Sequence, residues 1–187
     1  MLINPVNLTC CLGTNKNLQN KLTHSHYTGS TKSKWLTSKR TGCYKCGDCM
    51  ACPLVERTPT ITLTMDNAEY KLKIYMNCKS TCVAYVMYCM CWKQYVGKTL
   101  LEFRRRILEH VGDVKRKRNT SISVHINECP NGNTKAMRFI TVEQLKQTTR
   151  VGDVNKKLLQ AEAKWTYAMN SKSPNGLNKG FTFSPFL

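Results

Sequence analysis

The second half of the chain shows two patterns of hydrophobic positions, one typical of strands and one typical of a helix. Residues 83–88, VAYVMY, are β-branched and aromatic, and 94–97, QYVG, follow them after a short turn that carries cysteines. Two such runs joined by a turn predict an antiparallel hairpin. The apolar positions then change to helical spacing, which predicts an amphipathic helix. Its expected buried stripe comprises Leu100, Phe103, Ile107, Val111 and Val114.

This helix has a predicted start and a predicted end. Thr99 is followed three residues later by Glu102, which is the spacing of a capping box. The basic run KRKR, residues 115–118, closes the helix at the end where the helix dipole favours cations.

Three more elements follow along the chain. Residues 121–128 predict a short helix that Pro130 stops, and 137–142, MRFITV, predict a strand. Asp153 can cap a last long helix that runs to about Met169. The expected inner face of this helix comprises Val154, Leu158, Ala161, Trp165 and Ala168.

The order of these elements is β-β-α-α-β-α, which fits a small α/β domain with an antiparallel sheet flanked by helices. We expect this domain to occupy residues 83–187, with an extended tail at 181–186. A cysteine-rich segment, 43–82, precedes it and contains one strand region, YKLKIYM, at 70–76. Residues 1–42 are polar without a sustained hydrophobic period, and we expect them to be poorly ordered.

Charge is the dominant feature of the composition. The 187 residues include 29 Lys and Arg but 11 Asp and Glu, a formal net charge of +18. Such a surplus repels itself unless a polyanion is near, so it favours a nucleic-acid partner. A membrane surface and a merely soluble basic protein are the alternatives. We find neither a membrane-spanning apolar run nor a secretory start, and we expect a location inside the cell, on nucleic acid.

Eleven cysteines are too many for an ordinary intracellular protein, and without an export signal they favour metal-bound thiolates over disulfides. Cys43, Cys46, Cys49 and Cys52 stand at three-residue intervals, a spacing typical of a tetrahedral zinc site. The choice of ligands stays open. The alternative ligand set is Cys46, Cys49, Cys52 and Cys78, which leaves Cys43 outside the site.

A second candidate zinc site joins two other segments. Cys89 and Cys91 lie on the expected hairpin turn, and His125 and Cys129 lie on the short helix downstream. The alternative is a set of buried free cysteines, because a C-x-C pair is weaker evidence than C-x-x-C.

The predicted amphipathic helix also carries candidate chemistry. Arg106 and His110 are four residues apart and project from one face, and Tyr95 and Gly97 precede them on the strand. The glycine lets the backbone turn closely, an arginine fork suits a phosphate, and a histidine or tyrosine can move a proton. The alternative is a basic helix face that simply holds a nucleic-acid backbone.

Glu162 favours the catalytic alternative. It is the one carboxylate side chain after Asp153 and lies towards the inner side of the last helix. A lone acid there needs a partner, which is either an arginine or a hard cation such as Mg²⁺.

Together these residues resemble a known family. The chain resembles a GIY-YIG nuclease domain in two motifs, Tyr85 at the end of VAY and QYVGKT with its tyrosine ten residues later. It also resembles that domain at Arg106, His110, Glu162 and Asn178. The similarity is strongest to the C-terminal endonuclease of Penelope-like retroelements. It extends to the segments HSHYT, GCYKCGDCMAC, RVGDVNKKLLQAEAKW and SPNGLNKGFTF, and so covers the chain from about residue 20 to its end.

The resemblance implies a DNA endonuclease that depends on Mg²⁺ or Mn²⁺ and is stabilised by Zn²⁺. Tyr95 or Tyr85 would help to activate water, and Arg106 would hold the scissile phosphate. His110 would assist proton transfer or position the phosphate, Glu162 would bind Mg²⁺, and Asn178 would support the site. The expected contacts to DNA comprise Gly97, Lys98, Arg105, Lys115, Arg116, Lys117 and Arg118.

The chain also departs from the family. VAY replaces the first family triplet, Arg105 is a rival to Arg106, and Pro130 stands where relatives often carry a histidine. The reverse transcriptase that precedes this nuclease in such elements is absent from the sequence. We therefore keep an alternative, a non-catalytic, zinc-stabilised nucleic-acid-binding remnant. A zinc-dependent protein-interaction domain ranks below both. We expect DNA to be the main partner and RNA of a parent element to be a further one. The expected location is the nucleus.

Overall fold

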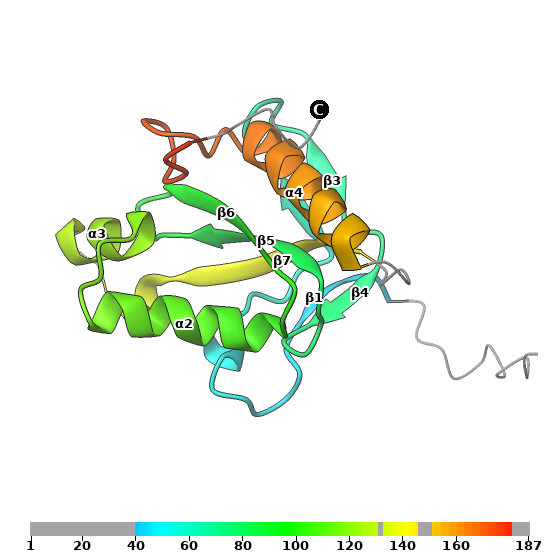
Figure 1. The fold of residues 1–187 in the computed structure, drawn as a ribbon, viewed down its shortest axis with the longest axis horizontal. Coiled ribbons are helices and arrows are strands. Elements are labelled where there is room, and N and C mark those ends of the chain that lie inside the picture. The colour runs from blue at the N-terminus through cyan, green and yellow to red at the C-terminus, as the bar shows by residue number, and fades with distance from the viewer. Residues whose placement is uncertain (1–39, 131–132, 146–150, 181–187) are drawn as a thin grey trace, which may run out of the picture. The chain divides into compact units, whose positions relative to one another are not determined.

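The computed structural model describes residues 40–130, 133–145 and 151–180, all within one compact unit, Arg40–Leu187. The expected N-terminal segment up to residue 39 and the extended tail at 181–186 lie outside the described residues. None of the described helices combines the length and apolar character needed to cross a membrane. The elements, labelled in Figure 1, are β1 Gly42–Tyr44, η1 Cys52–Leu54, β2 Thr60–Thr62, β3 Glu69–Lys71, β4 Tyr75–Asn77, β5 Val83–Tyr88, β6 Gln94–Thr99, α2 Phe103–Lys115, α3 Ser121–Glu128, η2 Thr134–Ala136, β7 Arg138–Gln144 and α4 Val151–Ala168.

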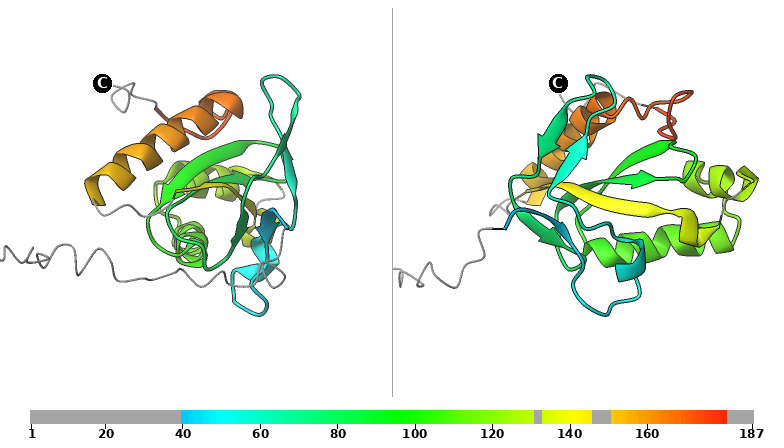
Figure 2. Two further views of the ribbon diagram at one scale, coloured as in Figure 1. Left: turned by 90° about the vertical axis from the view of Figure 1, so that its right-hand side faces the viewer. Right: turned by 180° about the vertical axis from the view of Figure 1, so that it is seen from behind.

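A three-stranded antiparallel sheet with the order β6-β5-β7 forms the centre of the fold. Its three strands run between α2 and α4 in all views (Figures 1 and 2). The predicted mixed α/β architecture and the element order β-β-α-α-β-α over this part of the chain are confirmed. The central strand, β5, is buried from Val83 to Met87, and Tyr85 pairs with Gly97 on β6.

The predicted capping box of α2 is wrong. The helix begins at Phe103, because Thr99 is still paired in the sheet and its hydroxyl accepts a bond from the Leu101 amide, 3.1 Å away. Glu102 precedes the helix without capping it, and its carboxylate binds the Arg104 guanidinium at 2.8 Å. Leu100 therefore lies outside the helix and is 40% exposed. The buried positions of α2 are Phe103, Ile107, His110 and Val114.

Helix α4 begins two residues before Asp153, which lies in the first turn and is not the cap. Its predicted inner face is confirmed at Val154, Leu158, Ala161 and Trp165, whereas Ala168 is half-buried. The Trp165 indole donates to Glu143 on β7 at 2.8 Å. This bond ties α4 to the sheet.

The cysteine-rich segment packs against the sheet. The single strand expected at 70–76 is two short strands, β3 and β4, which pair with β2 and β1 respectively. The Glu56 amide donates to the Phe139 carbonyl at 3.0 Å, and Val55 forms a bridge to the same residue. These contacts fix the segment to β7.

Candidate active site and metal centres

Tyr85 is the centre of a buried hydrogen-bonded group. Its hydroxyl lies 2.7 Å from Nε2 of His110 and accepts a bond from Nε of Arg106 at 3.1 Å. Burial, with a further contribution from the Arg106 charge, lowers the pKa of His110 to about 3. Burial also raises the pKa of Tyr85. At neutral pH a protonated Tyr85 therefore donates to a neutral His110, so the hydroxyl has a partner on each side.

Gly97 makes room for this group. It lies in the middle of β6, on the strand as expected, and directly across from Tyr85. A Cβ atom at this position would lie 2.5 Å from the Tyr85 hydroxyl oxygen and 2.8 Å from the Tyr95 ring. The role of the glycine is therefore to permit close approach of the Tyr85 ring to the β6 backbone.

Gly97→Ala is expected to lower the free energy of unfolding by roughly 1–3 kcal/mol, because the added methyl group must displace a buried ring. Gly180→Ala is the matched control, since its Cβ would meet nothing within 4 Å. Urea unfolding of the two variants measures the difference. Equal stabilities would contradict the packing of Tyr85 against Gly97.

The structure distinguishes the two candidate arginines. Arg106 reaches Tyr85 and also binds Glu109 at 2.8 Å, with its side chain 34% exposed. Arg105 is 68% exposed and has Glu102 at 4.0 Å as its ion-pair partner. Arg106 therefore joins the buried group, and its guanidinium is still partly open to solvent.

Glu162 belongs to the same electrostatic environment. It is half-buried, and burial raises its pKa while the charges of Lys98 and Arg106 act in the opposite direction. Its own charge contributes to raising the pKa values of Tyr85 and Tyr95, for which burial is the larger cause. Within the described parts of the chain Glu162 makes none of the ion pairs. The salt bridge to a described arginine that was the alternative for this acid is therefore not among the ion pairs.

Asn178 supports the strand beside this group. Its side-chain oxygen accepts from the Val96 amide at 2.9 Å, and its side-chain nitrogen donates to the Val96 carbonyl at 2.8 Å. The Leu177 amide also donates to the Gln94 carbonyl at 2.9 Å. Asn178 thus fixes the β6 backbone between Tyr95 and Gly97. It is a positioning residue for this strand.

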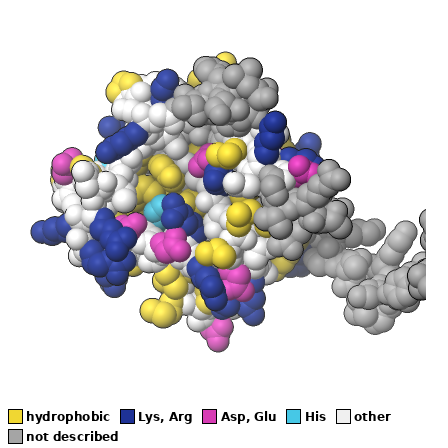
Figure 3. All heavy atoms as spheres, viewed as in Figure 1, with side chains coloured by type: hydrophobic (Ala, Val, Ile, Leu, Met, Phe, Trp, Pro, Cys, Tyr) yellow, Lys and Arg dark blue, Asp and Glu magenta, His cyan; other side chains and the backbone are white. Residues whose placement is uncertain are grey.

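Basic side chains are also gathered at the end of α2. Residues 115–118 at the end of α2 are all exposed. Asp113 pairs with Arg118 at 3.4 Å and with Arg116 at 3.9 Å. Figure 3 shows Lys and Arg side chains around a hollow in which a histidine, acidic and hydrophobic side chains are visible.

The first cysteine group is a candidate metal centre. The ligand atoms of Cys46, Cys49, Cys52 and Cys78 lie within 4.8 Å of one another. Three of the Sγ–Sγ distances are 3.4, 3.6 and 3.6 Å. A tetrahedral zinc with Zn–S bonds of about 2.3 Å requires sulfurs about 3.8 Å apart, so small shifts would bring the group to that geometry. Cys43 lies outside it, and its Sγ accepts instead from the Thr141 amide at 3.4 Å.

The second predicted group is also assembled. Cys89, Cys91, His125 and Cys129 bring their ligand atoms within 4.8 Å of one another, and Cys91 Sγ lies 3.1 Å from His125 Nε2. A metal here would join the β5–β6 turn to α3. Both groups could therefore hold a metal such as zinc.

Compared with protein families, curated proteins and solved structures, the chain matches none. Its function is therefore argued from the buried tyrosine group and the two candidate metal centres.

Two residues that contact the site were not among the predicted ones. Glu109 holds Arg106 in place, and its i, i+3 spacing on the helix was a usable signal. Phe139 on β7 stacks on the His110 ring with centroids 6.0 Å apart and an interplanar angle of 19°. No local pattern indicates this contact, because it joins residues 29 positions apart in the sequence.

Proposed function

We propose that the chain is a GIY-YIG-type endonuclease that hydrolyses phosphodiester bonds of DNA with Mg²⁺ or Mn²⁺. The observation that carries the proposal is the convergence of Tyr85, Arg106 and His110 into one hydrogen-bonded group within the electrostatic reach of Glu162. These residues come from β5, α2 and α4. A fold held together by packing alone would not need a partly exposed arginine within electrostatic reach of a half-buried acid that has no ion pair among the described residues.

The tyrosines have different parts in this proposal. Tyr85 is fully buried and bonded on both sides, so it orients Arg106 and does not meet water. Tyr95 is half-buried and packs edge-on against His110, so it is the tyrosine that can contact the attacking water. The low pKa of His110 makes it a weak base, and it acts as a positioning residue for Tyr85.

Arg106 and Glu162 would stabilise the negative charge on the phosphate, Arg106 directly and Glu162 through a bound cation. The guanidinium of Arg106 binds the scissile phosphate, with Lys98 nearby as a further cation. The Glu162 carboxylate is free of ion pairs among the described residues and suits a hard cation. That cation would stabilise negative charge on the phosphate and lower the pKa of bound water.

The positive surface charge would bind DNA. Zinc in both cysteine groups would stabilise the segments that carry the ligands. A second candidate function, a non-catalytic zinc-stabilised nucleic-acid-binding module, uses these two features alone. The basic run 115–118 favours it as much as it favours a nuclease. RNA of a parent element as partner and a nuclear location belong to either proposal.

Arg106→Ala is expected to lower the rate of plasmid nicking about 100-fold, as for loss of one preorganised donor to a transition-state charge. Arg105→Ala removes the same charge one residue away and is expected to change the rate less than threefold, roughly the effect of one surface cation. The initial rate of supercoiled-plasmid nicking in Mg²⁺ compares them. Equal losses would mean that both arginines serve only as DNA-binding charges, which favours the non-catalytic module.

A further inference from the structure

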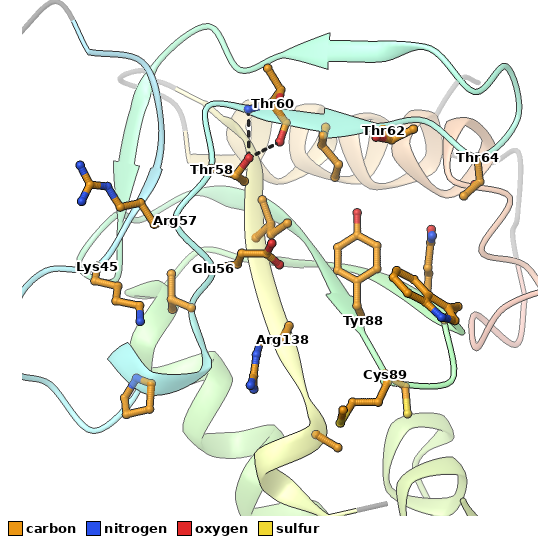
Figure 4. Close-up of a pocket in the computed structure, with 18 residues that line it drawn as sticks. Lys45, Glu56, Arg57, Thr58, Thr60, Thr62, Thr64, Tyr88, Cys89 and Arg138 are labelled. Carbon is orange, nitrogen blue, oxygen red and sulfur yellow. Dashed lines mark hydrogen bonds between the residues drawn. The ribbon is translucent and has the colours of Figure 1, made fainter. Parts of the chain in front are cut away.

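A second hollow, of 970 Å³, opens on the other face of the three-stranded sheet. Gln94, Tyr88 and Arg138 are directly paired neighbours on β6, β5 and β7, so their side chains form one row across this face. Tyr85 lies three residues from Tyr88 and points to the opposite face. Figure 4 shows the hollow between this row, the segment around Glu56 and strand β2, and we call it the back groove.

Gln94 leaves an unused acceptor in the back groove. The residue is 8% exposed, and its Oε1 has no hydrogen-bond partner among the described residues. A buried amide oxygen without a partner costs free energy unless a ligand supplies the donor. The exposed Glu56 carboxylate also lines the groove and makes no ion pair with the described residues. The groove therefore presents acceptors and calls for a ligand rich in N–H donors.

Trp92 supplies a stacking surface at the edge of the groove. It is 83% exposed and has a φ of 68°, an uncommon backbone conformation for a bulky residue. Its amide donates to the Cys89 carbonyl at 2.9 Å, and the turn carries two ligands of the second candidate metal centre. The turn is thus held in a strained conformation that presents an indole to solvent. Tyr88 adds a second ring, whose hydroxyl points into the hollow (Figure 4).

Cations line the other end of the groove. Lys45, Arg57 and Arg138 are exposed. Figure 4 shows Lys45 and Arg57 on the side of Glu56 away from Tyr88, whereas Arg138 is the strand neighbour of Tyr88. None of them forms an ion pair with a described acidic residue. Arg138 Nη1 donates to the Lys135 and Met137 carbonyls at 2.7 and 3.0 Å, and Arg57 lies over the Tyr44 ring at 5.6 Å. Each guanidinium has further N–H donors that can bind an anionic group.

We infer that the back groove binds an unpaired nucleobase of single-stranded nucleic acid, with its flanking phosphate on the basic side. The base stacks on Trp92, its exocyclic amino group donates to Gln94 Oε1, and Arg57 or Arg138 binds the phosphate. Stacking on an aromatic ring requires an accessible base face, which base pairs inside a duplex do not offer. An acidic peptide would satisfy the cations, and its backbone N–H groups could donate to Gln94, but it would offer no aromatic face to stack on Trp92.

The test is binding of a 12-nucleotide single strand of mixed sequence to the full zinc-loaded chain, measured by fluorescence anisotropy without Mg²⁺. The same strand in a blunt duplex and as RNA provides the comparison arms. Trp92→Ala is expected to weaken single-strand binding about tenfold, while Trp92→Phe retains most of it because a ring remains. Duplex binding is expected to stay within twofold of wild type. Tyr167→Ala, which removes another largely exposed aromatic ring, on α4, is the matched control with no expected effect.

Gln94→Leu is expected to weaken binding of an oligocytidine about fivefold and to leave a strand of abasic nucleotides unchanged, because the abasic strand has no base N–H donor. Equal losses for the single strand and duplex on Trp92→Ala would overturn the inference, as would no loss at all. Competition by polyglutamate as effective as that of the oligonucleotide would also overturn it. Equal loss for DNA and RNA supports a site that reads the base without the sugar. Cleavage does not enter these measurements, so they do not depend on the proposed nuclease activity.

Discussion

Removal of zinc is expected to unfold the cysteine-rich segment. Its strands are three residues long, and Cys52 and Cys78 converge in its buried part. Without a cation, the clustered thiols would hold each other by weak S–H bonds alone. A structural zinc contributes about 10–16 kcal/mol in small zinc-binding peptides, as much as the whole stability of a typical domain.

Metal analysis and thermal melting measure this effect together. Purified protein is expected to carry two zinc ions, one for each assembled group. Cys78→Ala should lose one zinc and its cooperative melting transition, whereas Cys43→Ala, a buried cysteine outside the groups, should retain both ions. Metal-free protein that melts at an unchanged temperature would contradict a structural role for zinc.

Glu162→Ala is expected to lower the nicking rate about 10³-fold, because loss of a metal's charge stabilisation costs several kcal/mol in the transition state. Folding should be little affected, since the carboxylate makes none of the ion pairs among the described side chains and is half-buried. Its pKa is raised by burial, so removing it also relieves a desolvation cost.

Asp153→Ala is the matched control, because it removes an exposed carboxylate from the same helix. Its nicking rate should stay within about twofold of wild type, as for an exposed charge. The rates are compared over a range of Mg²⁺ concentrations, with zinc content and melting temperature recorded for each variant. An active Glu162→Ala protein with an unchanged Mg²⁺ dependence would remove this residue from the metal site.

Local patterns in the sequence predicted much of the fold. The β-branched and aromatic run of β5, followed after a short turn by QYVG, predicted the hairpin, and the bounds of α3 were correct to the residue. C-x-x-C spacing identified Cys46, Cys49 and Cys52, and the remaining choice between Cys43 and Cys78 needed the fold. The start of α2 was missed because the end of β6 also places polar side chains near backbone amides.

The interior of the site was less predictable, because its contacts join distant elements. Helical spacing placed Arg106 and His110 on one face, but the bond of each to Tyr85 depends on how α2 packs against β5. The close approach at Gly97 depends on strand register. The back groove is formed by side chains from several separate segments, so no single window of sequence indicates it.

The most direct test of a nuclease is relaxation of supercoiled plasmid by the zinc-loaded chain with and without Mg²⁺. Mg²⁺ should be withheld rather than chelated, because a chelator would also remove the zinc that stabilises the fold. We predict open-circular product that accumulates with Mg²⁺ and is absent without it. Binding of the plasmid without nicking, by a folded protein that carries both zinc ions, would contradict catalysis and leave the nucleic-acid-binding module as the function.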